Sequence, residues 1–208
     1  MSQLVESIML KDGWFHNLLS HEERMNNARK AVFNCNDELE LEDVLDESLA
    51  EYKKGKKESE LKGKIKCRIL YQENIESIEF EPYKPRTIKS LKVITDDTIS
   101  YKYKTANRTC LNELFEQRGS CDDIIIVKNG FVTDSSAANI LFFDGKRWVT
   151  PSTPLLKGTQ RQLLLNLETI TSKLIRPEDI QSFQKVRLVN AMLEFEDEVD
   201  VMVKDVVL

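Results

Sequence analysis

The sequence lacks the features that mark several common classes of protein. No apolar run approaches the roughly 18 residues of a membrane span, so we expect no integral membrane protein. The first ten residues have no basic n-region and no adequate apolar h-region, so we expect a cytoplasmic protein without a secretion signal. Basic residues are in deficit, with 30 Lys and Arg against 35 Asp and Glu. The net charge of −5 argues against a nucleic-acid-binding protein, whose footprint is usually basic.

Residues that bind metals or form disulfides are also scarce. The chain has two histidines and four cysteines, and no two cysteines form a CxxC pair. This spacing argues against a zinc site, so we expect no metal centre. We expect the four cysteines to be free thiols in a reducing compartment.

The 208 residues are 41% hydrophobic, which is enough to bury a substantial core. Asp12-Gly13 and Asn129-Gly130 each separate two apolar stretches and predict β-hairpins. A third hairpin is predicted around Asp144-Gly145, and we expect the last two hairpins to form an antiparallel meander. A capping-box pattern at Ser20 predicts the start of a helix there.

Apolar alternation predicts strands over 65–71, 75–80, 91–94 and 99–103, and helical spacing predicts helices over 40–52, 107–117 and from 158 through 170. The chain therefore indicates an α+β protein with two sheet-and-helix units in sequence. We place an N-terminal domain at residues 1–97 and a C-terminal domain at residues 98–208.

Three segments carry residue types suited to chemistry. Lys102 and Lys104 lie near the predicted domain junction, where ligand clefts often form, and a buried lysine can supply a free amine. The alternative is that both are ordinary solvent-facing residues of a strand. Period-2 alternation puts both lysines on one face, so position alone does not choose between them.

The second segment is residues 130–139, in which Asp134 and Asn139 flank four small residues. A carboxylate there could hold a pyridine nitrogen in its protonated form. Alternatively, Asp134 and Asn139 are turn residues that bond their own backbone. The third segment is residues 150–161, where Gly158-Thr159 precedes a helix whose first amides could bind a phosphate. The alternative there is a simple helix start.

In this order, the three segments resemble the class IV aminotransferase family, which consists of fold-type IV pyridoxal-phosphate enzymes. The family's lysine motif resembles 104–108 (KTANR), its carboxylate strand resembles 132–139 (VTDSSAAN), and its Gly-x-x-Arg element resembles 158–161 (GTQR). Near the start, the family's His-x-x-Arg helix is similar to 21–24 (HEER), and its late Asn-Ala strand is similar to Asn190-Ala191. The family usually has glutamate at the position of Asp134.

The resemblance implies a fold as well as a site. It implies a two-domain fold-type IV enzyme like D-amino acid aminotransferase, with an N-terminal α/β sandwich and a C-terminal β-barrel-like domain. The implied cofactor is pyridoxal 5′-phosphate, with Lys104 as the catalytic Schiff-base lysine and Asp134 facing the ring nitrogen. The residues implied to contact the cofactor are Arg24, Lys104, Arg108, Asp134, Thr159, Gln160, Asn190 and Ala191.

The expected function is that of a class IV aminotransferase-like enzyme acting on a small amino-bearing molecule, as a homodimer. One alternative is 4-amino-4-deoxychorismate lyase, which eliminates pyruvate to give 4-aminobenzoate in the folate pathway. Branched-chain aminotransferases also share these motifs. A further alternative is a non-catalytic protein that keeps the fold, because fold alone does not imply function.

Overall fold

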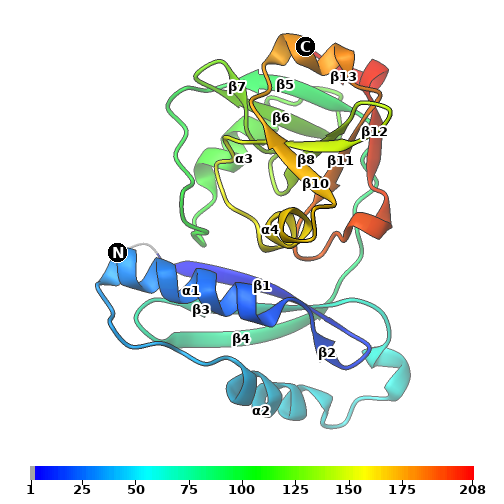
Figure 1. Cartoon of the computed structure of the whole chain (residues 1–208). Coiled ribbons are helices and arrows are strands. Elements are labelled where there is room, and N and C mark those ends of the chain that lie inside the picture. Colours follow the sequence, from blue (N-terminus) through cyan, green and yellow to red (C-terminus); the bar gives the residue numbers. More distant parts are fainter. Residues whose placement is uncertain (1–2) are drawn as a thin grey trace. The chain divides into compact units, whose positions relative to one another are not determined.

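The computed structural model describes residues 3–208, except for the side chains of residues 58 and 59. The chain forms two compact units (Figure 1). The first contains residues up to 85 together with 103–107, and the second contains 86–102 and 108–208. Within residues 3–208, no helix has the length and apolarity needed to cross a bilayer.

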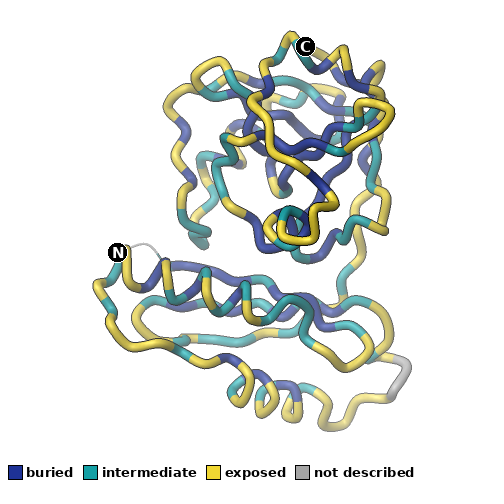
Figure 2. Tube along the Cα trace, in the orientation of Figure 1, coloured by how far each residue is buried: buried dark blue, intermediate teal, exposed yellow. Residues whose placement is uncertain are grey.

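The first unit is a four-stranded antiparallel sheet with two helices. The strands are β1 (Leu4–Lys11), β2 (Trp14–Phe15), β3 (Ile65–Tyr71) and β4 (Ile75–Pro82), in the order β2-β1-β3-β4. The helices are α1 (Leu18–Phe33) and α2 (Glu42–Lys53), with a short 3-10 helix η1 (Glu58–Leu61). Contacts join α1 to β1 and α2 to β4 (Figure 1). Leu4, Ile8 and Met25 belong to its main core cluster, and Figure 2 shows β1 as a mostly buried strand.

The second unit contains two sheets. One has the order β13-β5-β6-β7 and the other β10-β9-β8-β11-β12. The strands are β5 (Leu91–Thr95), β6 (Asp123–Lys128), β7 (Phe131–Val132), β8 (Asn139–Phe143), β9 (Trp148–Pro151), β10 (Ile170–Lys173), β11 (Lys185–Val189), β12 (Asp200–Met202) and β13 (Val206–Val207). The helices are α3 (Thr109–Glu116) and α4 (Thr159–Asn166), with 3-10 helices η2 (Pro177–Ser182), η3 (Phe195–Asp197) and η4 (Val203–Asp205).

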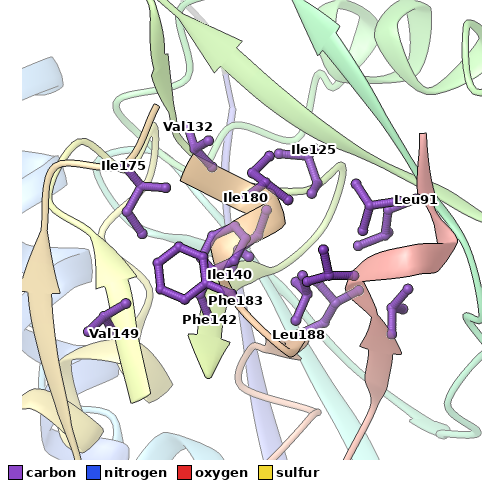
Figure 3. Packing of buried hydrophobic residues seen from close by; sticks show 14 of the residues in the cluster. Leu91, Ile125, Val132, Ile140, Phe142, Val149, Ile175, Ile180, Phe183 and Leu188 are labelled. Carbon is purple, nitrogen blue, oxygen red and sulfur yellow. The ribbon is translucent and has the colours of Figure 1, made fainter. Parts of the chain in front are cut away.

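One apolar cluster joins the two sheets of this unit. Leu91 and Ile125 come from the first sheet, and Ile140, Phe142 and Leu188 come from the second, all of them buried (Figure 3). Removing such side chains from water is the main favourable contribution to folding. The packed sheets therefore give the loops at their strand ends a rigid support.

The Asp-Gly and Asn-Gly hairpins are confirmed. Asp12 and Gly13 have φ of 54° and 87°, and Asn129 and Gly130 have φ of 51° and 77°. Left-handed φ at both central residues is what a two-residue hairpin turn requires, and this pair of residue types tolerates it. The antiparallel pairing of β8 with β9 confirms the third hairpin.

Several predictions about individual elements are wrong. The meander does not form, because β7 and β8 lie in different sheets and β6 pairs in parallel with β5. Helix α1 begins at Leu18 after Asn17, whose φ of 54° breaks the chain direction, so Ser20 lies inside the helix rather than capping it. Helix α4 ends at Asn166, and Ile170 begins β10.

The predicted strand over 99–103 is also absent from the described chain. Residues 99–102 belong to the second unit without pairing as a strand. Residues 103–107 return to the first unit, where Thr105 forms an antiparallel bridge with Leu4 of β1. The sequence assigned Lys104 to the C-terminal domain, whereas its backbone is hydrogen-bonded to β1. The domain boundary between residues 97 and 98 stays a prediction.

Candidate active site

The second unit holds a buried carboxylate at the loop between β7 and β8. Asp134 is 6% exposed, and Asn139 donates from Nδ2 to Asp134 Oδ1 at 2.7 Å. The Leu156 amide donates to Asp134 Oδ2 at 3.0 Å. Asn139 Nδ2 also donates to the Leu156 carbonyl at 2.9 Å. These bonds fix the orientation of the carboxyl group, and they join residues from two loops rather than closing a local turn.

Asp134 has no cation as a hydrogen-bond partner in the described part of the chain. Burial raises the pKa of Asp134 to about 6, and the amide donors and the more distant charge of Arg161 offset this only in part. A carboxylate in this environment gains free energy from a nearby cation, since desolvation has removed the water that would stabilise its charge. The group is suited to hold a proton on a ligand nitrogen.

Gly158 brings the start of α4 against the Asp134–Asn139 pair. A Cβ at Gly158 would lie 2.0 Å from Asn139 Oδ1, so a larger residue would displace the Asn139 amide. Gly158 is the N-cap of α4, and Thr159 and Gln160 form its first, buried turn. Amides at a helix N-terminus point away from the helix and favour anions. Thr159 and Gln160 therefore lie where a phosphate could be bound.

Arg161 joins the two ends of the 150–161 segment. Its side chain is 6% exposed, and it donates from Nε to Thr150 Oγ1 at 3.2 Å and from Nη2 to the Pro151 carbonyl at 2.9 Å. The Thr-Pro segment at the end of β9 is thereby attached to the first turn of α4. Arg161 thus has a supporting role in this arrangement.

Two predicted residues contact the small-residue loop directly. Arg108 donates from Nη2 to the Ser136 carbonyl at 2.7 Å, and Asn190 donates from Nδ2 to the Ala137 carbonyl at 3.0 Å. The Arg108 Nε atom is buried and has no hydrogen-bond partner among the described residues. A buried polar atom in this condition is costly unless a ligand or water completes it.

The Asn190 side chain is engaged in the turn that follows it. Its Oδ1 accepts hydrogen bonds from the amides of Met192 at 2.8 Å and Leu193 at 3.0 Å. Ala191 therefore lies at the tip of a turn that Asn190 holds in shape. The side chain of Asn190 supports the loop, and the backbone of this turn is the part that could face a ligand.

The first unit also holds a buried carboxylate, Glu6 of β1, which is 0% exposed. Arg24 donates from Nε to Glu6 Oε1 at 2.9 Å and from Nη2 to Oε2 at 2.5 Å, and His21 Nδ1 lies 2.7 Å from Oε2. Burial would raise the pKa of Glu6, but the charge of Arg24 and the bonds from His21 and Arg24 lower it to about 2. Burial also lowers the pKa of His21, although Glu6 opposes this effect.

The backbone of Lys104 is hydrogen-bonded to β1, the strand that carries Glu6. Its carbonyl accepts a hydrogen bond from the Val5 amide at 2.9 Å, and the Ala106 amide donates to the Gln3 carbonyl at 2.8 Å. Lys104 is half-buried, and its charge contributes to lowering the pKa of His21. Lys102, the other candidate lysine, is exposed and belongs to the second unit.

The predicted residues thus form two groups. Arg24 and Lys104 are both attached to β1 in the first unit, whereas the others gather around the 134–139 loop and the start of α4 in the second. Sequence reasoning missed Glu6, although an acidic residue in the middle of an apolar strand was a usable signal. It also missed the contact of Gly158 with Asn139, for which the local sequence contains no signal.

Comparison with known proteins identifies the family. Residues 3–195 match the family described as Amino-transferase class IV. An uncharacterized protein of Haemophilus influenzae is 34% identical over 200 residues, covering 92% of this chain and 98% of the relative. A Schizosaccharomyces pombe protein provisionally named an aminodeoxychorismate lyase is 26% identical over 195 residues, covering 88% and 83% of the two chains.

A solved structure agrees with these relatives. The crystal structure of a Haemophilus somnus 129PT protein, provisionally named a 4-amino-4-deoxychorismate lyase, superimposes with a TM-score of 0.83. It is 32% identical and covers 94% of this chain and 98% of its own. The two-domain, fold-type IV architecture expected from the motifs is therefore confirmed, and the chain belongs to the class IV aminotransferase family of enzymes.

Proposed function

We propose that this protein is a pyridoxal-phosphate-dependent enzyme acting on the amino group of a small molecule. The observation that carries the proposal is Asp134, a carboxylate held in a fixed orientation and buried without a cationic hydrogen-bond partner among the described residues. The amine-bearing Lys104 and the cation Arg24, both attached to β1, supply the remaining groups that the cofactor requires.

Three features of the chain fit this cofactor. The buried carboxyl of Asp134, with its raised pKa, suits a protonated ring nitrogen. The Gly158 contact would leave no room for a Cβ, so the start of α4 packs tightly beside that carboxyl. The orphaned Arg108 Nε is a buried donor in the described chain that a ligand or water could complete.

Bound pyridoxal phosphate supplies an aldehyde that condenses with amines and a ring that stabilises negative charge on the adjoining carbon. Lys104 Nζ would be the amine that attaches the cofactor and, when released, the base that takes a proton from the substrate carbon. Asp134 would hold the proton on the ring nitrogen. Arg24 and the amides of Thr159 and Gln160 would bind the phosphate, and Arg108, Asn190 and Ala191 would shape the loops around it.

Elimination of pyruvate from 4-amino-4-deoxychorismate is the first reaction to test. The Haemophilus somnus and Schizosaccharomyces pombe relatives, at 32% and 26% identity, are both provisionally named lyases for this substrate. Transamination of an amino acid is the second candidate, because the matched family is that of class IV aminotransferases. We propose a homodimer in either case.

A spectroscopic experiment tests the cofactor and the lysine together. Purified protein mixed with pyridoxal phosphate should develop a visible absorbance band, and borohydride reduction followed by peptide mapping should place the label on Lys104. Lys104→Ala should abolish both signals, whereas Lys102→Ala should retain them. Label on Lys102, or no band at all with the wild-type chain, would overturn the proposal.

A product assay separates the two reactions. Incubation with 4-amino-4-deoxychorismate in the absence of a 2-oxo acid acceptor should release pyruvate if the enzyme is a lyase. An aminotransferase should require the acceptor and convert it to an amino acid. Neither product, in a protein that has bound pyridoxal phosphate, would point to the non-catalytic alternative.

A further inference from the structure

Glu6 occupies a position where an apolar residue would be expected. On β1 it shares a face with Leu4 and Ile8, its neighbours two residues away, which are both buried in the main core of the first unit. Its carboxylate is 0% exposed. Burying a charge costs free energy that hydrogen bonds and a partner charge must offset, and an apolar replacement of such a pair is often at least as stable. Fold stability therefore does not by itself account for a carboxylate here.

The carboxylate instead organises two side chains of α1. Arg24 uses Nε and Nη2 to bind both oxygens of Glu6, and His21, one helical turn earlier, bonds to Oε2 from Nδ1. A paired fork of this kind fixes the plane of a guanidinium, not only its distance. Because Nδ1 faces a carboxylate, it carries the proton, which also fixes the tautomer of the His21 ring.

The same strand fixes the position of Lys104. Val5, adjacent to Glu6, donates its amide to the Lys104 carbonyl, and Leu4 bridges to Thr105. Val5 and Glu6, which are adjacent on β1, therefore position the backbone of Lys104 and orient the guanidinium of Arg24. All of these contacts lie within the first unit.

We propose that Glu6 is a positioning residue, which holds the Arg24 guanidinium in the orientation that receives the cofactor phosphate. The inference rests on the proposed function and extends it to a residue that would not touch the cofactor. The fork to Glu6 uses Nε and Nη2 of Arg24. Glu6 acts through orientation rather than attraction, since its own charge would repel a phosphate.

The test compares two ligands that differ only in the phosphate. Wild-type protein, Glu6→Gln and the matched control Asp37→Asn are titrated with pyridoxal phosphate and with pyridoxal, and absorbance is followed. Asp37→Asn removes the carboxylate partner of Arg29, another buried arginine of α1, at a site that none of the proposed cofactor contacts uses. Thermal unfolding of the cofactor-free proteins shows which variants are folded, and Glu6→Asp, which keeps the charge but shortens the reach, replaces Glu6→Gln if that variant does not fold.

We expect Glu6→Gln to weaken pyridoxal phosphate binding by about tenfold to a hundredfold, the scale of a lost hydrogen bond to a charged group, and to change pyridoxal binding little. Asp37→Asn should bind both ligands as the wild type does. Equal weakening for both ligands would assign Glu6 a structural role only and would overturn the inference, as would unchanged or tighter binding of pyridoxal phosphate. A wild-type chain that binds neither ligand would instead refute the proposed function.

Discussion

Each unit of the protein contains a buried carboxylate whose pKa is strongly shifted, Glu6 in the first unit and Asp134 in the second, and the two shifts are in opposite directions. Glu6 has a pKa of about 2, whereas Asp134 has a pKa of about 6. Burial raises the pKa of both groups. The difference comes from their partners, because Glu6 contacts a guanidinium and an imidazole, whereas Asp134 contacts amide groups.

This difference shows which of the two carboxylates already has a cationic partner within the protein. Glu6 already has its cation and remains charged over the whole physiological range. Asp134 is held in place by amides that orient it without neutralising it, so a ligand bearing a positive nitrogen would stabilise it. Perturbed carboxylates of the second kind are typical of functional sites.

Replacing Glu6 should produce the largest change in stability. Its pKa is lowered from 4.5, so the ionised group stabilises the fold above about pH 4.5, and this contribution is lost as the pH falls toward 2. The shift corresponds to about 3 kcal/mol of unfolding free energy. We expect Glu6→Gln to be destabilised by about that amount at pH 7 and to lose less stability on acidification, as measured by urea unfolding between pH 7 and 3. Equal acid sensitivity of both proteins would contradict this prediction.

Replacing Asp134 should change the pH dependence in the opposite direction. Its pKa is raised from 3.8, so the protonated group contributes stability below about pH 3.8 that is lost as the pH rises through 6. Between pH 4 and 7, the unfolding free energy of Asp134→Asn should therefore improve relative to the wild type by about 2 kcal/mol. The measurement is urea unfolding of the cofactor-free proteins. The hydrogen bonds lost in Asp134→Asn should shift its unfolding free energy by a constant amount at every pH. If the two proteins differ only by such a constant amount, Asp134 is not desolvated.

Gly158→Ala, next to the Asp134–Asn139 pair, should cause an intermediate loss of unfolding free energy. The new Cβ would displace Asn139 Oδ1, and overpacking of this kind costs about 1–3 kcal/mol. Unfolding in urea should show the loss, and pyridoxal phosphate should bind more weakly because Asn139 also holds Asp134. In the Asn139→Ala background, which removes the clashing group, the same substitution should cost less. Additive effects of the two changes would argue against the contact.

Asp37→Asn should have the smallest effect. Its side chain is 65% exposed, and its partner Arg29 also donates to the carbonyls of Glu73 and Asp37. Water screens the exposed Asp37 carboxylate, and the two carbonyls keep the buried Arg29 guanidinium hydrogen-bonded when that charge is removed. We expect its midpoint of urea unfolding to be close to that of the wild type. A loss of unfolding free energy as large as that of Glu6→Gln would contradict the expectation that the buried carboxylate contributes more than the exposed one.

Local chemistry accounts for the parts of the fold that the sequence predicted. Asp12-Gly13 and Asn129-Gly130 specify tight turns because these residues accept left-handed φ, independently of the rest of the chain. The pairing of β5 with β6, and the separation of β7 from β8 into different sheets, depend on contacts between distant segments. The residues of each strand alone do not specify this pairing or this separation, so the predicted meander was wrong.

The candidate site divides in the same way. Short motifs located Asp134, Lys104 and the Gly158 helix start, since each motif is contiguous. The supports of these residues are not contiguous, as with Glu6, which meets Arg24 only when α1 packs on β1. The sequence did contain a sign of Glu6, because a charge among the apolar residues of β1 contradicts the pattern of a buried strand.

The return of residues 103–107 to the first unit makes the chain pass between the units three times, at residues 85/86, 102/103 and 107/108. A cut after residue 97 would give one fragment Lys104 and the other fragment β1, the strand that aligns it. Neither fragment would retain the arrangement of the Lys104 amine and the Arg24 guanidinium. Recombination that exchanges one half of this gene for a homologous half must therefore preserve the fit between β1 and the incoming lysine segment.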